Sequence, residues 1–125
     1  MAYPTDLKYT KEHEWIRVDG NTGAIGITDF AQQQLGDVVY VVLPEVGSTI
    51  TAGQVFGTIE SVNAVSELLE PVSGEVVETN SSLKDRPDHV NSKPHETWMV
   101  KVKLAGSGEV NSLMDSAAYE QLIQK

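Results

Sequence analysis

Short runs of strand-like sequence, none longer than eight residues, follow one another along the chain and are separated by glycine, proline, asparagine and aspartate. β-Branched and aromatic residues favour strands, and such turn residues end them. The pattern predicts strands at 13–18, 24–27, 38–43, 54–61, 65–69, 74–78 and 98–104. A chain of many short strands buries its apolar side chains by packing one sheet on another or by closing a barrel. We therefore expect a mainly β fold, a β-sandwich or a flattened barrel.

Two short helices are expected, one between strands and one after the last strand. Thr28 and Asp29 supply the N-cap of the first helix, and Gly36 can end it as a C-terminal cap. The second helix is expected at about 115–124, behind Asp115 as its cap, because three apolar residues recur there at helical spacing, namely Tyr119, Leu122 and Ile123.

Three segments carry predictions about burial. Residues 38–43 form a nearly continuous apolar run, which indicates a buried strand. Residues 80–94 are polar and contain two prolines, so we expect a surface loop. In the last strand, 98–104, apolar residues alternate with three residues that are expected to form a solvated face, namely Met99, Lys101 and Lys103.

The charge of the chain is strongly negative and unevenly distributed. The 125 residues include 9 Lys plus Arg and 18 Asp plus Glu, which gives a formal net charge of −9. This balance argues against a nucleic-acid-binding protein, since neutralising phosphates requires basic residues. Residues 18–83 contain no lysine or arginine. The acidic residues of this middle segment form either an ordinary solvated surface or a face for basic partners.

Several classes of protein are excluded by what the sequence lacks. Cysteine is absent, which excludes disulfides, thiolate metal sites and a cysteine nucleophile. The three histidines lack metal-ligand spacing, and neither a phosphate-binding glycine loop nor a nucleophile elbow occurs. No apolar stretch is long enough to cross a membrane, and no targeting segment is visible. We expect one domain over 1–125, with no catalytic activity, no metal and no membrane contact.

Two neighbouring segments carry a resemblance to a known family. The sequences GTIESVNAVSE at 57–67 and PVSGEVVETN at 71–80 resemble the lipoyl-attachment hairpin of the glycine cleavage system H protein family. The resemblance covers most of the chain, through KYTKEHEW at 8–15, GITDFAQ at 26–32, LGD at 35–37, LPEVG at 43–47 and the strand 98–104. It implies a lipoyl-domain-like β-sandwich, a barrel-sandwich hybrid, with short flanking helices.

The resemblance also implies a function. Members carry a lipoyl-bound aminomethyl group between glycine decarboxylase (P protein), aminomethyltransferase (T protein) and dihydrolipoyl dehydrogenase (L protein), after lipoylating enzymes have attached the lipoate. By this resemblance the chain is a non-catalytic carrier in glycine catabolism and one-carbon metabolism, and we expect a monomer. Its compartment would be the cytoplasm of a bacterium or the mitochondrial matrix of a eukaryote.

One position departs from the family. The family places the lipoyl-bearing lysine between Val62 and Ala64, where this chain has Asn63. The amide nitrogen of asparagine is not a nucleophile, because its lone pair is delocalised into the carbonyl group. No other lysine lies in residues 18–83, so we expect an arm-less chain that is inactive as a carrier. Asn63 itself suits a hairpin tip, since asparagine tolerates positive φ and can bond to its own turn.

Two origins of Asn63 stay open: a substituted form of an active carrier, or a natural relative that has lost its arm. The alternative function is a lipoate-free scaffold or docking protein that binds the same enzymes or the lipoylation machinery. A biotinyl carrier is excluded, because the hairpin lacks both the lysine and its usual flanking methionines.

Four acidic or glycine positions match functional positions of the family. Glu60 and Gly74 match positions used for recognition by lipoylating enzymes; the alternatives are a solvated acid and a structural turn glycine. We favour recognition for Glu60 and a structural role for Gly74. Glu14 and Glu67 match the carboxylates that hold the protonated amine of the loaded arm, and their alternative is a pair of surface acids.

Two further sites differ from the family or carry large side chains. Gln34 stands where the family often has a histidine, and the segment 94–98 lacks the tyrosine and glycine expected before its tryptophan. Trp15 and Trp98 are assigned to the core rather than to cofactor stacking.

Overall fold

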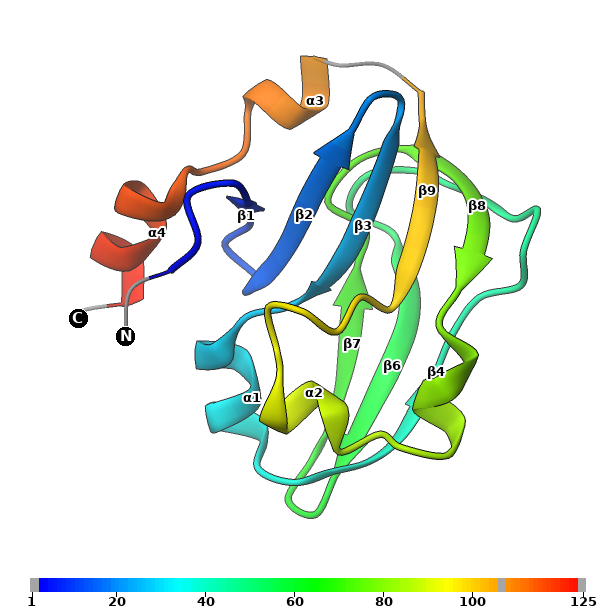
Figure 1. Cartoon of the computed structure of the whole chain (residues 1–125), viewed down its shortest axis with the longest axis vertical. Coiled ribbons are helices and arrows are strands. Elements are labelled where there is room, and N and C mark those ends of the chain that lie inside the picture. The colour runs from blue at the N-terminus through cyan, green and yellow to red at the C-terminus, as the bar shows by residue number, and fades with distance from the viewer. Residues whose placement is uncertain (1–2, 106–107, 124–125) are drawn as a thin grey trace.

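The structure of the protein is a computed structural model that describes residues 3–105 and 108–123. Its strands form two antiparallel sheets (Figure 1). The six-stranded sheet has the order β1 (Lys8–Tyr9), β2 (Glu14–Asp19), β3 (Thr22–Ile27), β9 (Val100–Leu104), β8 (Gly74–Thr79) and β5 (Thr49–Ile50). The three-stranded sheet has the order β4 (Val38–Val42), β6 (Val55–Ser61) and β7 (Val65–Leu69). The predicted mainly β sandwich is therefore confirmed.

The main core contains side chains from both sheets. Ile16 lies opposite Ile25, and Ile25 lies opposite Val100, so the inward positions of β2, β3 and β9 form one row. Ile59 and Leu68 of the smaller sheet belong to the same buried cluster. Alternation along each strand is what delivers these residues to one face.

The two expected helices are present. In α1 (Asp29–Leu35) the Thr28 hydroxyl accepts a hydrogen bond from Ala31 N at 3.2 Å, and Gly36 ends the helix with φ of 82°. α4 (Ser116–Ile123) begins one residue after Asp115, whose Oδ1 accepts from Ala118 N at 2.9 Å. Residues 124–125 of the expected range lie outside the described residues. A further short helix, α3 (Gly108–Asn111), was not expected from the sequence.

The segment expected as a surface loop is half helical. It contains the 3-10 helix η1 (Ser81–Lys84) and the helix α2 (His89–Ser92). Leu83 and Val90 are buried in the main core and anchor the segment. The loop prediction is wrong in this respect, because two isolated apolar residues within a polar sequence are enough to fasten a segment of this length.

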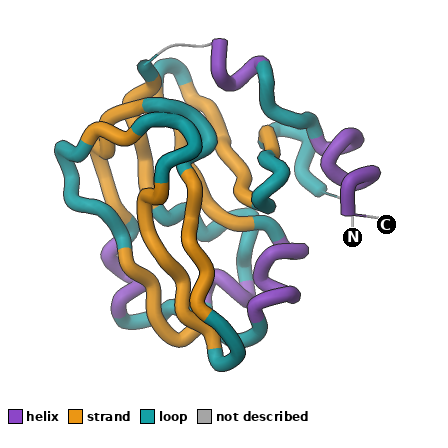
Figure 2. The backbone as a smooth tube through the Cα atoms, turned by 180° about the vertical axis from the view of Figure 1, so that it is seen from behind, coloured by secondary structure: helices purple, strands orange, loops and turns teal. Residues whose placement is uncertain are grey.

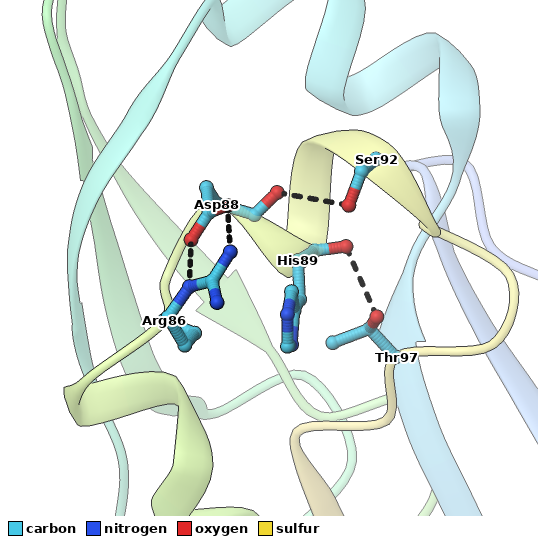
Figure 3. Close-up of polar contacts among 5 residues, drawn as sticks. All are labelled: Arg86, Asp88, His89, Ser92 and Thr97. Carbon is cyan, nitrogen blue, oxygen red and sulfur yellow. Dashed lines mark hydrogen bonds and ion pairs between the residues drawn. The ribbon is translucent and has the colours of Figure 1, made fainter.

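Polar contacts stiffen the same segment, as Figure 3 shows. The Arg86 guanidinium donates to both carboxylate oxygens of Asp88 at 3.1 and 3.0 Å, and this exposed pair lowers the pKa of Asp88. The Thr97 hydroxyl donates to the carbonyl of His89 at 3.0 Å, and the Ser92 hydroxyl donates to the carbonyl of Asp88 at 3.4 Å. The bond from Thr97 ties the first residue of α2 to the chain before β9, and the other bonds lie within residues 86–92.

The strand expected to be buried at 38–43 is an edge strand that is buried on one face. Among the described residues β4 pairs with β6 alone, and its register shifts between Val38 and Tyr40. Val38 and Val41 are buried in the main core, whereas Val39, Tyr40 and Val42 are exposed. The prediction of burial is therefore right for the inner face and wrong for the outer one, because an apolar run does not reveal whether another element covers its second face.

The start of the last strand also differs from the prediction. β9 begins at Val100, and Met99, expected on the solvated face, is completely buried. Residues 98 and 99 precede the strand, so the alternation does not extend to them. Trp98 is only half-buried, with the Lys101 ammonium 4.7 Å from its ring centroid. Trp15 is fully buried as predicted, and its Nε1 donates to the carbonyl of Pro94 at 2.9 Å.

A second, aromatic cluster lies where α4 and the N-terminal segment pack beside β1 and β2 (Figure 1). The rings of Tyr9 and Tyr119 stack with centroids 4.8 Å apart. β1 is tied to the chain before α4 by paired bonds between Tyr9 and Met114 at 2.8 and 2.9 Å. The buried members of this cluster, which we call the aromatic cluster, are Tyr3, Leu7, Tyr9, Trp15 and Tyr119.

Candidate functional site

The turn between β6 and β7 is the most exposed part of the three-stranded sheet. Ser61 N donates to the carbonyl of Ala64 at 2.8 Å, and the Ser61 hydroxyl accepts from Asn63 N at 3.2 Å and from Ala64 N at 3.0 Å. Among the described residues His13 is the one non-glycine residue with positive φ. The expectation for Asn63 is therefore wrong on both points: its φ is not positive, and the Ser61 side chain closes the turn.

The Asn63 side chain instead points to the C-terminal end of α1. Its Nδ2 donates to the carbonyl of Leu35 over a long 3.5 Å, and Val62 N donates to the carbonyl of Asp37 at 3.0 Å. A Cβ at Gly36 would lie only 2.8 Å from Asn63 Nδ2. Glycine at position 36 thus both ends the helix and leaves space for the turn.

The turn rests on the end of α1 and the start of β4, which we call the seat of the turn. Asn91 of α2 bonds to both parts of this seat. Its Oδ1 accepts from Val38 N at 2.8 Å, and its Nδ2 donates to the carbonyl of Gly36 and to Gln32 Oε1, both at 2.9 Å. One side chain therefore holds the end of α1 and the start of β4 together. The turn, the seat and α2 form one connected series of contacts.

A cleft of about 270 Å³ lies beside α1, between the start of β2 and β7. The structure places Glu14 and Glu67 together in its lining. Gln34 lines the same cleft. The apolar part of the lining is made of Ile27, Phe30, Ala31, Leu35 and Leu68.

The two carboxylates of the cleft differ in environment. Glu14 is 2% exposed, so it is not a surface acid. Its Oε2 accepts from Leu69 N at 2.8 Å and its Oε1 from the Thr10 hydroxyl at 3.3 Å. Burial raises the pKa of Glu14 to about 8, against the opposing effect of these bonds. Glu67 is exposed on β7, opposite Thr58.

Glu70 is a buried acid that the sequence analysis did not single out. It is 2% exposed, and neither carboxylate oxygen has a hydrogen-bond partner among the described residues. Burial, together with the charges of Glu14 and Glu109, raises its pKa to about 8. Its position inside the apolar run from Leu68 to Val72 was the available signal. A carboxyl group in this position is held neutral near neutral pH.

His13 lines the cleft and was left unassigned by the sequence. Its backbone is in the left-handed region, with φ of 69°, which is strained for a residue with a side chain. Its Nδ1 lies 2.8 Å from the Tyr119 hydroxyl, which lies 2.7 Å from the Thr28 hydroxyl. Burial lowers the pKa of His13. The backbone of His13 is held by bonds to Thr10 and Thr28, and its ring by the Tyr119 hydroxyl of α4, so two of these three contacts come from segments that are distant in sequence.

The two remaining expected site residues lie far apart. Glu60 is exposed on β6, between Tyr40 of β4 and Val65 of β7, close to the turn. Gly74 begins β8 opposite Leu104, at the end of the sheet away from the turn (Figure 1). A Cβ at Gly74 would lie 2.6 Å from the carbonyl oxygen of Lys103, so close packing accounts for this glycine.

Within residues 3–105 and 108–123, no three His, Asp or Glu side chains gather as they would around a metal ion. Across the same ranges, no helix is both long and apolar enough to cross a membrane.

Comparisons with known proteins agree with one another. The sequence model of one family, described as "Glycine cleavage H-protein", matches residues 7–125. The "Glycine cleavage system H protein" of Koribacter versatilis is 57% identical over 121 residues, covering 97% of this chain and 94% of that protein. That of Brevibacillus brevis is 52% identical over 126 residues, covering 100% of both. The crystal structure of a glycine cleavage system H protein from Mycobacterium marinum superimposes with a TM-score of 0.87 at 36% identity, covering 95% of this chain and 97% of that one.

Proposed function

Because the chain belongs to the glycine cleavage H-protein family, we propose that it is an H-type protein whose lipoyl-attachment position is taken by Asn63. Members of this family are non-catalytic lipoyl carriers, so the chain is not an enzyme. The lipoyl-domain type of sandwich expected from the sequence is confirmed by the matching crystal structure.

The observation that carries the proposal is the chemistry of the turn. Asn63 occupies the tip that joins β6 and β7, and its carboxamide is a hydrogen-bond donor to Leu35 rather than a nucleophile. No lysine lies anywhere between residues 18 and 83. The residues present therefore do not fit a covalently attached lipoate, and the chain as it stands is an arm-less H protein.

The cleft beside α1 retains the features of a site for a small amine. Glu14 and Glu67 both line a partly apolar pocket, and a protonated amine near Glu14 would offset the cost of ionising this buried carboxyl group. This supports their assignment as the arm-stabilising carboxylates of the fold. Glu60, exposed three residues before the attachment position, is assigned to recognition by lipoylating enzymes.

The proposed partners are those of the family: glycine decarboxylase, aminomethyltransferase, dihydrolipoyl dehydrogenase and the lipoylating enzymes. The curated relatives described above come from bacteria, which supports a cytoplasmic location. A second candidate function, a lipoate-free docking protein, is favoured by one observation: the sheet face beside the turn is exposed and apolar.

Intact-mass measurement after co-expression with a lipoyl ligase tests the proposal. The native chain is expected to gain no lipoyl adduct, whereas Asn63→Lys is expected to gain one. An adduct on the native chain would overturn the chemical argument about Asn63. A lysine form that stays unmodified, while a family member expressed in parallel is lipoylated, would overturn the assignment of residue 63 as the attachment position.

The docking alternative is tested by binding to purified glycine decarboxylase. A native chain that binds as tightly as the unlipoylated Asn63→Lys form is the result expected of a scaffold. A native chain that shows no binding, when the lipoylated form binds, would remove this alternative.

A further inference from the structure

The outer face of the three-stranded sheet is apolar and uncovered. Figure 2 shows this sheet from outside, with no helix across it. Of the nine large apolar side chains that the described residues expose, six belong to β4, β6, β7 and the turn. Five of these six form what we call the valine face, which surrounds the turn and consists of Val39, Tyr40, Val42, Val62 and Val65.

Acidic side chains are interleaved with these apolar residues. The register places Tyr40, Glu60 and Val65 in one row across the three strands. The next row consists of Val42, Thr58 and Glu67. Both rows face solvent, with Tyr40 53% and Val65 67% exposed. The face therefore combines aliphatic contact area with two carboxylates and no cation.

The apolar and acidic composition of the valine face determines which partner surface is complementary to it. A second copy of the chain would place Glu60 and Glu67 against their own equivalents, which costs free energy through like-charge repulsion. Residues 18–83 offer no lysine or arginine to offset that repulsion. The complementary surface is an apolar patch with a rim of lysine and arginine.

The place of the valine face identifies which partner can use it. An enzyme that acts at the far end of a long arm can remain at a distance from the turn. An enzyme that acts on the side chain of residue 63 itself must bring its active site to the turn, and so must cover Val62 and the neighbouring strands. This inference rests on the proposed function, in which the enzyme that acts on residue 63 is the lipoylating enzyme.

We propose that the valine face docks on the lipoylating enzyme, and that this chain competes there with H proteins that can be lipoylated. Asn63 offers no amine, so no acyl transfer follows docking and the complex can only dissociate. The chain is thereby a reversible inhibitor of lipoylation rather than a substrate for it.

Competition kinetics with a purified lipoyl ligase test this proposal. Asn63→Lys is the substrate, and the native chain is the inhibitor. We expect competitive inhibition, with an inhibition constant close to the KM of the substrate form, because the two proteins share every docking residue. Absence of inhibition at native-chain concentrations well above that KM would overturn the proposal.

Variants locate the contact on the valine face. Tyr40→Lys with Val65→Lys, introduced into the native chain, is expected to raise the inhibition constant at least ~10-fold, because it removes apolar contact and adds cations opposite a cationic rim. Val77→Lys is the matched control, since Val77 is a comparably exposed valine on β8 of the other sheet. Equal effects of the two changes would overturn the placement of the contact, and thermal unfolding of both variants verifies that they are folded.

A direct measurement separates this inference from the proposed function. If Asn63→Lys is not lipoylated, the proposed function fails, and calorimetric titration of the native chain into the ligase still decides whether the valine face binds it. If Asn63→Lys is lipoylated but the native chain neither binds nor inhibits, the docking inference alone fails.

Discussion

Two apolar surfaces of the molecule differ in whether other segments of the chain cover them. The aromatic cluster is covered by the N-terminal segment and α4, and its buried members are at most 8% exposed. The valine face carries side chains of similar character that are 44–67% exposed. The chain thus uses its own C-terminal helix to close one surface and leaves the other open. Closure produces stability, whereas an open apolar surface beside a functional turn is available for binding.

The closed surface also shapes the cleft. Tyr119 of α4 places its hydroxyl between His13 and Thr28, and the ring of His13 lies 4.7 Å from that of Phe30. His13 and Phe30 both line the cleft. The aromatic cluster therefore holds one wall of the cleft from behind, although it is remote from the turn in sequence.

The largest expected effect is a difference in the free energy of unfolding between a variant in the aromatic cluster and a variant on the valine face. Trp15→Ala is expected to lower the free energy of unfolding by about 3–5 kcal/mol, because it empties a fully buried site and leaves the carbonyl of Pro94 unpaired. Tyr40→Ala on the valine face is expected to change it by less than about 0.5 kcal/mol. Urea denaturation of both variants makes the comparison, and equal losses would show that the valine face is part of the core.

The next effect concerns two buried acids. Glu14 and Glu70 have pKa values raised from 4.5 to about 8 in the folded protein. At a pH between 4.5 and 8 these two carboxyl groups are protonated in the folded chain and ionised in the unfolded chain. The free energy of unfolding therefore falls as the pH rises from 4.5 towards 8. We expect a loss of a few kcal/mol, measured by urea denaturation across this range.

Glu70→Gln sharpens that prediction. Glutamine cannot ionise, so the variant is expected to lose less stability than the native chain as the pH rises, and Glu67→Gln on the exposed strand is the control. An unchanged pH dependence in Glu70→Gln would mean that Glu70 is ionised at low pH in the folded protein.

A smaller effect is expected at the seat of the turn. Asn91→Ala removes three hydrogen bonds from the end of α1 and the start of β4 and is expected to cost about 1–3 kcal/mol. Hydrogen exchange of the Val62 amide, which donates to Asp37, should become faster than in the native chain. If the amide keeps its protection, the turn does not depend on α2 for its position.

The smallest effect is expected at the turn itself. Asn63→Lys removes one long hydrogen bond from an exposed side chain, so the free energy of unfolding should change by less than about 1 kcal/mol. Thermal unfolding gives the comparison with the native chain. A larger loss would show that the contact of Asn63 with the end of α1 is a structural requirement of this chain.

Part of this molecule is determined locally, and that part could be predicted from the sequence. The strand periods, the Thr28 cap and the Gly36 end of α1 depend on residues within a few positions of one another. The family resemblance likewise rests on contiguous segments. It identified Glu14 and Glu67 as a candidate pair, and the structure places both in the lining of one cleft.

Burial could not be predicted in the same way. Glu14 and Glu67 look alike in sequence, yet one is buried and the other exposed, because β2 lies within the larger sheet while β7 is an edge strand of the smaller one. Leu83 and Val90 were assigned to a loop for the same reason: their burial depends on the sheet beneath them.

By itself the sequence determined the kind of fold, the family and the absence of any lysine near the turn, since periodicity, caps and composition are properties of the chain alone. Only the tertiary structure decided which apolar surface is covered. Val42 and Tyr119 both lie in regular elements; α4 packs against β1 and Tyr119 is buried, whereas η1 contacts β4 and still leaves Val42 44% exposed. Burial is set by contacts between segments distant in sequence, and these contacts exist only once the chain has folded.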